Sequence, residues 1–242
     1  MSARFEELAW RETPMGEISL RRRRDPVLDV DVYEVRLGEE YLMSSLFTVA
    51  EEELSRLGLA AHPSTEAGSL DVVVGGLGLG YTAVAALEDP RVGTLTVVEA
   101  LPDVVDWHER ELLPEASRLV SDPRTRLVTA DFFTTLGAGR PLDPEHLGHP
   151  EASYDVVLVD IDHSPRHVLH VSHAVFYSEA GLRRLRRRLK DGGVFALWSD
   201  DPPDDDFTTL LGGAFDAVEA HVVEFANFQT GGTSANTVYV AR

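Results

Sequence analysis

A run of apolar residues that leads straight into a glycine loop limits the folds open to this chain. Residues 69–76, SLDVVVGG, predict a strand of nearly continuous apolar residues, as expected where both faces of a strand are covered. The loop GGLGLG follows at 75–80, and GYTAVAALEDP at 80–90 predicts a short helix. This junction favours a parallel sheet with helices on both faces.

The alternation of strands and helices continues to the end of the chain. A helix at 103–120, with Pro114 as a candidate break, and a helix at 176–193 closed by Gly192 separate further strands. Those strands are predicted at 94–100, 126–131, 154–160 and 193–199, before a short helix at 204–215 and a closing pair of strands at 217–227 and 237–242. The fold class is therefore α/β, with a doubly wound, mainly parallel sheet. Ligands bind such sheets beyond the carboxyl ends of the strands, so residues after the first four strands should form the site.

The chain before residue 70 has a different pattern. Short strands are predicted at 15–24 and 29–45, with turns at Gly16, Asp25–Pro26 and Gly38. A helix is predicted at 45–60, with Gly58 at its carboxyl end, and 62–69 is a loop. We therefore divide the chain into a small N-terminal module of strands plus a helix, residues 1–65, and a larger domain, residues 66–242.

The glycine loop has the spacing GxGxG, formed by Gly76, Gly78 and Gly80. The dinucleotide-binding fingerprint would require Gly or Ala at position 81, where this chain has Tyr81. The loop also lacks the Lys-Ser/Thr ending of a phosphate-binding P-loop. The spacing resembles the first motif of class I S-adenosylmethionine-dependent transferases, and a tight turn without a ligand is the alternative.

Acidic residues follow the second and third strands of the larger domain. Glu99 lies 19 residues beyond Gly80, where a carboxylate can accept hydrogen bonds from both ribose hydroxyls. Asp131 can receive an adenine amino group while the apolar Phe132 covers the ring. The alternatives are a solvated acid at Glu99 and a helix cap at Asp131.

Two carboxylates and an imidazole follow the fourth strand. Asp160 ends the strand, and Asp162 and His163 come directly after it. Such groups could hold an amine and take its proton, because only a neutral amine is a nucleophile. These three residues are the candidate catalytic groups, and Asp160 is also a candidate cofactor-binding residue. Simple solvation of a loop is the alternative for Asp162 and His163.

These segments together resemble the spermidine synthase-like branch of class I S-adenosylmethionine-dependent transferases. The resemblance covers residues 65–200 in order and rests on DVVVGGLGLG, TLTVVEA, DPRTRLVTADFF, YDVVLVDIDHSP and the segment from 174 to 199. It implies a seven-stranded sheet, and it makes the N-terminal module the small β-domain of aminopropyltransferases. It also implies that Glu99 binds ribose, that Asp131 binds adenine, and that Asp160 aligns with the catalytic aspartate of the family.

The chain departs from the family at two places that recognise the amine. Spermidine synthases carry GGGDGG in the loop, and Gly78 stands where the family has the aspartate. Their motif D-S/T-S/T-D-P is here DIDHSP, so the second acid is displaced to Asp162 or replaced by His163. Because Gly78 leaves room for a carboxylate, we favour methyl transfer from S-adenosylmethionine to an amine. The alternatives are a polyamine aminopropyltransferase using decarboxylated S-adenosylmethionine, and a non-catalytic binding protein on this fold.

The net charge of −19 disfavours nucleic acid as a partner and favours a cationic small-molecule substrate, unless it serves solubility alone. The chain has no Cys, no apolar stretch of 18 residues and no signal peptide, so we expect a cytoplasmic protein without a membrane partner.

Four histidines between His163 and His173 suggest a lid rather than a metal site, and no metal is predicted. A homodimer is the oligomer that analogy suggests.

Overall fold

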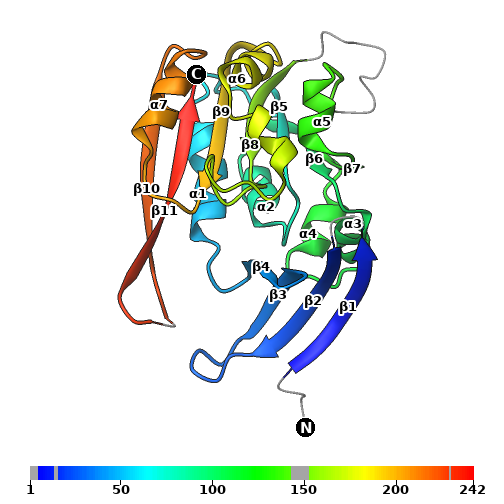
Figure 1. Cartoon of the computed structure of the whole chain (residues 1–242). Coiled ribbons are helices and arrows are strands. Elements are labelled where there is room, and N and C mark those ends of the chain that lie inside the picture. The colour runs from blue at the N-terminus through cyan, green and yellow to red at the C-terminus, as the bar shows by residue number, and fades with distance from the viewer. Residues whose placement is uncertain (1–4, 14–15, 143–152, 229) are drawn as a thin grey trace.

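The structure is a computed structural model that describes residues 5–13, 16–142, 153–228 and 230–242. Its described strands form a sheet of seven and a sheet of four (Figure 1). The larger sheet has the order β10-β11-β9-β8-β5-β6-β7, with β7, β6, β5, β8 and β9 parallel and β11 antiparallel to both neighbours. Its strands are β5 (Leu70–Gly75), β6 (Val92–Glu99), β7 (Thr125–Thr129), β8 (Tyr154–Val159), β9 (Leu189–Ser199), β10 (Val218–Ala226) and β11 (Thr233–Ala241). The predicted seven-stranded α/β sheet is confirmed.

Helices cover both faces of this sheet. Successive residues of each strand point to opposite faces, so the apolar strands supply one hydrophobic core on each side. Val156 and Leu158 of β8 join the core on one face, and Val157 and Val159 join the core on the other. The first core is completed by α1 (Val49–Ala60), α2 (Tyr81–Leu87), α3 (Pro102–Glu109) and α4 (Ala116–Ser121). The second is completed by α5 (Phe132–Gly137), α6 (Glu179–Arg186) and α7 (Asp205–Gly212). The break expected near Pro114 separates α3 from α4.

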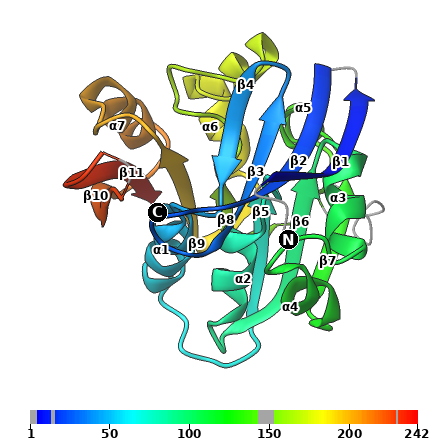
Figure 2. The same ribbon diagram turned by 90° about the horizontal axis from the view of Figure 1, so that it is seen from below.

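The N-terminal strands form an antiparallel sheet that lies across one end of the larger sheet (Figure 2). They are β1 (Phe5–Thr13), β2 (Gly16–Arg24), β3 (Asp31–Leu37) and β4 (Glu40–Ser44). Strand β1 was not predicted, and Met15 of the strand predicted at 15–24 lies outside the described residues. Ile18, Leu20 and Val35 are buried in the same core as α1 to α4, so the small sheet is packed firmly onto the large domain.

The four arginines at 21–24 lie in β2, which is an interior strand between β1 and β3. Arg22 pairs with Glu6 of β1, and Arg23 pairs with Glu34 of β3. Acidic residues of the same sheet therefore balance the charge of these arginines. The homodimer stays a prediction.

The ends of two predicted helices are corrected by the packing around glycines. Helix α1 continues through Gly58 to Ala60. A Cβ at Gly58 would lie only 2.6 Å from Leu158 Cδ2, so the glycine is there to let the helix lie close to the sheet. Helix α6 ends at Arg186, and Gly192 lies inside β9 with a φ of +74°. Gly192 is part of an irregularity in the β8–β9 register, which is a use of glycine that resembles a helix stop in sequence.

Helix α1 packs on β9 and β11 of the larger sheet, although the sequence groups it with the N-terminal strands. The division after residue 65 stays a prediction. None of the described helices has the length and apolar character needed to cross a lipid bilayer.

Candidate active site

The loop between β5 and α2 turns sharply at three glycines. Gly76, Gly78 and Gly80 have φ values of +93°, +49° and +93°, which favour glycine. A Cβ at Gly76 would collide with the carbonyl oxygen of Asp160, so the loop lies directly against the end of β8. A Cβ at Gly80 would lie 2.8 Å from His108 Cε1. The GxGxG spacing therefore reflects close backbone packing on both sides of the loop.

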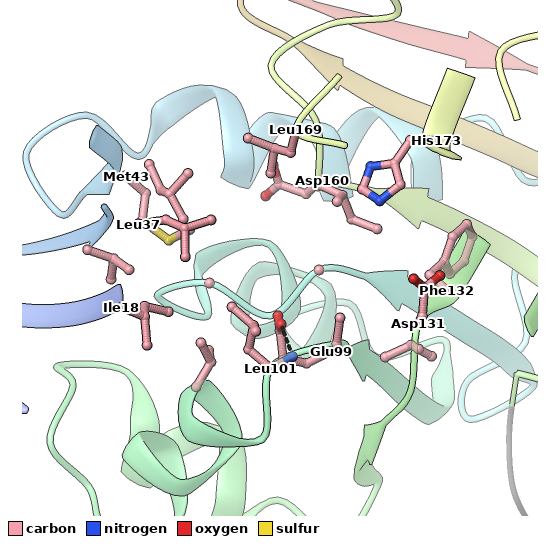
Figure 3. A pocket seen from close by; sticks show the side chains of 18 of the residues that line it. Ile18, Leu37, Met43, Glu99, Leu101, Asp131, Phe132, Asp160, Leu169 and His173 are labelled. Carbon is pink, nitrogen blue, oxygen red and sulfur yellow. Dashed lines mark hydrogen bonds between the residues drawn. The ribbon is translucent and has the colours of Figure 1, made fainter. Parts of the chain in front are cut away.

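Glu99 closes the loop from the end of β6. Its Oε2 accepts a hydrogen bond from the Leu77 N–H at 3.0 Å. Its Oε1 accepts one from the Leu101 N–H at 2.8 Å, which Figure 3 shows as a dashed line. Burial raises the pKa of Glu99, and these N–H donors oppose that rise. A carboxylate oxygen can accept more than one hydrogen bond, so both oxygens keep capacity for ligand hydroxyls.

Asp131 and Phe132 lie at the end of β7. Asp131 caps α5, because its Oδ1 accepts a hydrogen bond from the Thr134 N–H at 2.7 Å. The helix-cap alternative is therefore present in the structure, and Asp131 still lines the cavity beside Glu99. Phe132 is buried and lies so close beneath Gly75 that a Cβ there would be 2.9 Å from its ring.

These groups line a cavity with a volume of about 800 Å³, counting space open to solvent. Glu99 and Asp131 face it from the ends of neighbouring strands, and Phe132 lies beside Asp131 (Figure 3). The opposite wall comes from the small sheet and includes Ile18, Leu37 and Met43. An apolar cavity with two acids at its edge can hold a flat ring and a polyhydroxylated group.

Asp160 follows β8 and lines this cavity. Its Oδ2 accepts a hydrogen bond from the Thr82 hydroxyl at 2.6 Å, and its N–H donates to the Gly75 carbonyl at 2.8 Å. Burial raises the pKa of Asp160 to about 6, and the Thr82 hydrogen bond opposes the rise. A buried carboxyl group with a pKa close to neutrality can exchange a proton during a reaction.

A second cavity, with a volume of about 630 Å³ counting open space, adjoins the first. The two share Met43, Gly78 and Asp160 among their lining residues. Glu51 and Trp198 line the second cavity alone. Within the described residues, neither cavity is lined by a Lys or an Arg.

Asp162 is enclosed and holds the segment that follows it. Its Oδ1 accepts hydrogen bonds from the Leu169 N–H at 2.7 Å and from His173 Nδ1 at 2.8 Å. Its Oδ2 accepts one from the Tyr177 hydroxyl at 2.9 Å. These contacts hold the segment after β8 in place, and the catalytic role of Asp162 stays a prediction.

His163 is placed at the edge of the second cavity, where its Nε2 lies 2.8 Å from Glu40 Oε1 of β4. The remaining histidines of the segment have separate partners: His167 contacts Asp201, and His170 contacts Ser172. No group of three potential metal ligands gathers in the part of the chain that the structure describes. The segment includes a short 3₁₀ helix, Val171–Val175, and covers the site beside Leu169.

Three residues of the site were not singled out from the sequence: Glu51, Thr82 and Trp198. Glu51 is the first of three consecutive glutamates at the start of a helix, where acids usually face solvent. Only the packing of α1 against α2 and the sheet brings Glu51 to the cavity. Thr82 follows the glycine loop and Trp198 lies near the end of β9, which are positions that many other residues share.

The comparison with protein-family models finds no match. Among curated proteins, a polyamine aminopropyltransferase from Corynebacterium efficiens is 30% identical over 128 residues. That alignment covers 53% of this chain and 22% of the relative, so the chain matches only about a fifth of that protein's length.

Solved structures match far more of the chain. Spermidine synthase from Thermotoga maritima has a TM-score of 0.71 at 17% identity, covering 97% of this chain and 72% of that one. A spermidine synthase in complex with the transition-state analogue AdoDATO has a TM-score of 0.70 at 17% identity, covering 97% and 71%. Human methyltransferase-like protein 13 in complex with SAH has a TM-score of 0.56 at 16% identity, covering 80% and 82%. The chain therefore has the spermidine synthase-like form of the class I S-adenosylmethionine-dependent transferase fold, as the sequence motifs predicted.

Proposed function

We propose that this protein is an aminopropyltransferase that joins the aminopropyl group of decarboxylated S-adenosylmethionine to an amine. The observation that carries the proposal is the meeting of two cavities at Asp160, with acids and no described Lys or Arg in their linings. One cavity suits a nucleoside donor, and the other suits a cationic acceptor.

The larger cavity would take the donor. Glu99 would accept hydrogen bonds from the ribose hydroxyls while it holds the glycine loop through Leu77 and Leu101. Asp131 would receive the adenine amino group, with Phe132 beside the ring. The sulfonium group would then point towards Asp160, where the cavities meet, and the acids would favour its positive charge.

Met43 argues against the methyl transfer that the sequence favoured. That preference assumed that Gly78 leaves room for the carboxylate of ordinary S-adenosylmethionine. A Cβ at Gly78 would lie 2.7 Å from Met43 Sδ, so the thioether of the small sheet lies against one side of the glycine and narrows the space there. A donor carboxylate at this junction would also lie near Asp160 with no Lys or Arg in the described lining, which favours the decarboxylated donor.

The reaction requires little beyond alignment and loss of one proton. The neutral amine attacks the donor carbon bonded to sulfur, the C–N bond forms, and the C–S bond breaks. The electron pair of that bond stays on sulfur, and the sulfonium becomes a neutral thioether. Asp160 would hold the amine beside this carbon and accept its proton, while Asp162 and His163 position the segment that covers the site.

Methyl transfer remains the second candidate, because position 78 lacks an acid and the fold is shared with a methyltransferase. Calorimetry with decarboxylated S-adenosylmethionine, S-adenosylmethionine and methylthioadenosine separates the candidates. We expect the decarboxylated donor to bind at least about tenfold more tightly than S-adenosylmethionine, because it lacks the repelled carboxylate. The opposite order would favour methyl transfer, and no binding of any of the three would indicate a non-catalytic protein.

A further inference from the structure

We propose that Glu51 is the second carboxyl group of the acceptor cavity, and that Glu51 and Asp160 together select an aliphatic primary ammonium group and take up its proton. This inference rests on the proposed function, because it concerns the acceptor side of the same site. It assigns a proton-accepting and specificity role to a residue in the first turn of α1.

The positions of the two carboxyl groups are fixed by helix packing. The Thr82 hydroxyl donates to Asp160 Oδ2 and lies 3.3 Å from the main-chain oxygen of Glu51. The Ser55 hydroxyl donates to the Thr82 carbonyl at 2.6 Å, which ties the next turn of α1 to α2. The start of α1, the start of α2 and the end of β8 are therefore joined at one place.

The carboxyl group of Glu51 faces the cavity without a donor from another residue. It is half-buried, and no other described residue gives it a hydrogen bond. Its neighbour Glu53, by contrast, is paired with Arg56 at 3.0 Å. A half-buried carboxyl group beside a second carboxyl group is stabilised by a proton or by a cationic ligand.

The groups around Glu51 supply no stable positive charge. Those on α1, on α2, after β8 and after β9 are Glu52, Tyr81, Asp160, Asp162, His163 and Asp200. Glu52 is engaged by Arg56, Asp162 by the contacts described above, and His163 by Glu40. Burial raises the pKa of Tyr81 to about 12, so its hydroxyl stays neutral.

The charge of the carboxyl pair therefore depends on its ligand. Burial, and then repulsion by Asp160, raises the pKa of Glu51 to about 8, while that of Asp160 is raised to about 6. At neutral pH the unliganded pair thus holds about one proton. An arriving ammonium group replaces that proton as the compensating charge, and the rings of Tyr81 and Trp198 in the cavity wall can contact a cation and its methylene chain.

The proton balance of the transfer then closes on the pair. The bound ammonium gives one proton to a carboxylate of the pair, and the neutral amine attacks the donor carbon. The products are a secondary ammonium ion, a neutral thioether and one proton, which leaves the pair for solvent. Before the step, the two carboxylates face the two reacting cations, which are the attacking ammonium and the sulfonium; the second ammonium of a diamine and the ammonium of the donor's aminopropyl group are additional charges.

The test compares Glu51→Gln with the matched control Glu53→Gln, which removes a charge from the same helical turn outside the cavity. Calorimetry with 1,4-diaminobutane and with 1,4-butanediol measures the cation preference without turnover. We expect Glu51→Gln to weaken diamine binding at least about tenfold, to leave methylthioadenosine binding within about twofold, and to abolish the release of protons on diamine binding. Glu53→Gln should match the wild type.

Kinetics give the second readout. For the wild type, kcat/KM for the acceptor should rise between about pH 6.5 and 8 as the pair loses its proton, and Glu51→Gln should lose this rise. Wild-type diamine binding by Glu51→Gln, equal binding of the diol, or the same loss in Glu53→Gln would each overturn the inference. If the wild type binds the diamine through Glu51 but transfers nothing, the proposed function fails and the inference stands. If Glu51→Gln does not fold, Glu51→Asp should shift the pH limb, and an unshifted limb would overturn it.

Discussion

The hydroxyl group of Thr82 donates a 2.6 Å hydrogen bond to Asp160 Oδ2, and this contact joins the glycine-loop helix to the proposed reaction centre. Thr82 is buried in the first turn of α2, directly after Gly80 and Tyr81. Burial raises the pKa of Asp160, and the turn that would approach the donor lowers it through this hydrogen bond.

Thr82→Val should make Asp160 a stronger base and shift the pH dependence of the reaction. The hydrogen bond lowers the pKa of Asp160, so its loss raises that pKa above its value of about 6. The acid limb of kcat/KM should move to higher pH, by on the order of one pH unit. Thr82→Ser keeps the hydroxyl and should behave as the wild type. Coincident profiles for the valine and serine variants would contradict the prediction.

Glu99→Gln should weaken donor binding by about 1.5–3 kcal/mol, because a neutral amide replaces a charge-assisted acceptor of two hydroxyls. The substitution also disturbs the Leu77 and Leu101 contacts, so a weaker affinity for the donor would not by itself separate a lost ribose contact from a disturbed loop. Calorimetry with methylthioadenosine and its 2′-deoxy analogue resolves this. The wild type should lose affinity for the deoxy analogue, and Glu99→Gln should distinguish the two compounds much less. An equal deoxy penalty in both proteins would remove Glu99 from the ribose site.

The strands, and the gathering of Glu99, Asp131 and Asp160 at one end of the sheet, could be predicted because they follow from local periodicity and parallel topology. Strand β1 could not, because its residues are mostly exposed on both faces and leave no clear alternation. The roles of Met43 and Glu51 depend on how β4 and α1 pack over the glycine loop. Such contacts join residues far apart in sequence, and no local pattern marks them.

Gly78→Asp should increase the preference for the decarboxylated donor, since a carboxylate there repels the carboxylate of S-adenosylmethionine. The new side chain would meet Met43 Sδ, so the substitution is best made together with Met43→Ala. Binding of both donors to the double variant and to Met43→Ala alone gives the effect of the aspartate. An unchanged or reversed preference relative to Met43→Ala would show that position 78 does not face the donor's amino acid end.

Glu51→Gln should also stabilise the protein at alkaline pH. The folded-state pKa of Glu51 is about 8, above its ordinary value of 4.5, so folding favours its protonated form. The stability linked to this group is present below about pH 4.5 and is lost as the pH rises towards 8. At pH 8.5 we therefore expect Glu51→Gln to have a higher free energy of unfolding than the wild type, by on the order of 1–3 kcal/mol, and to be similar at pH 4.5. Urea unfolding at both pH values, with Glu53→Gln as control, measures this, and a destabilised variant at pH 8.5 would count against a cavity-facing carboxyl group.

Asp160→Asn separates proton transfer and acceptor binding from donor binding. Asparagine keeps the size of the side chain and can still accept the Thr82 hydrogen bond through its amide oxygen, so the junction between α2 and β8 should persist. The variant cannot accept the ammonium proton, and single-turnover rates with decarboxylated S-adenosylmethionine and 1,4-diaminobutane should fall by roughly 10²–10⁴-fold. Affinity for methylthioadenosine should hardly change, because Glu99 and Asp131 would hold the nucleoside.

Asp162→Asn is the informative comparison for that variant, because Asp162 lies two residues further on and is hydrogen-bonded to Leu169, His173 and Tyr177. Loss of the Asp162 carboxylate should lower thermal stability and raise the acceptor KM, because the segment that it holds over the site loosens. The single-turnover rate at saturating acceptor should fall less than in Asp160→Asn. A normal rate in Asp160→Asn would mean that alignment alone drives transfer. A rate loss as large in Asp162→Asn at saturation would place the proton acceptor on Asp162 instead, and a large loss of nucleoside affinity in Asp160→Asn would make Asp160 a donor ligand.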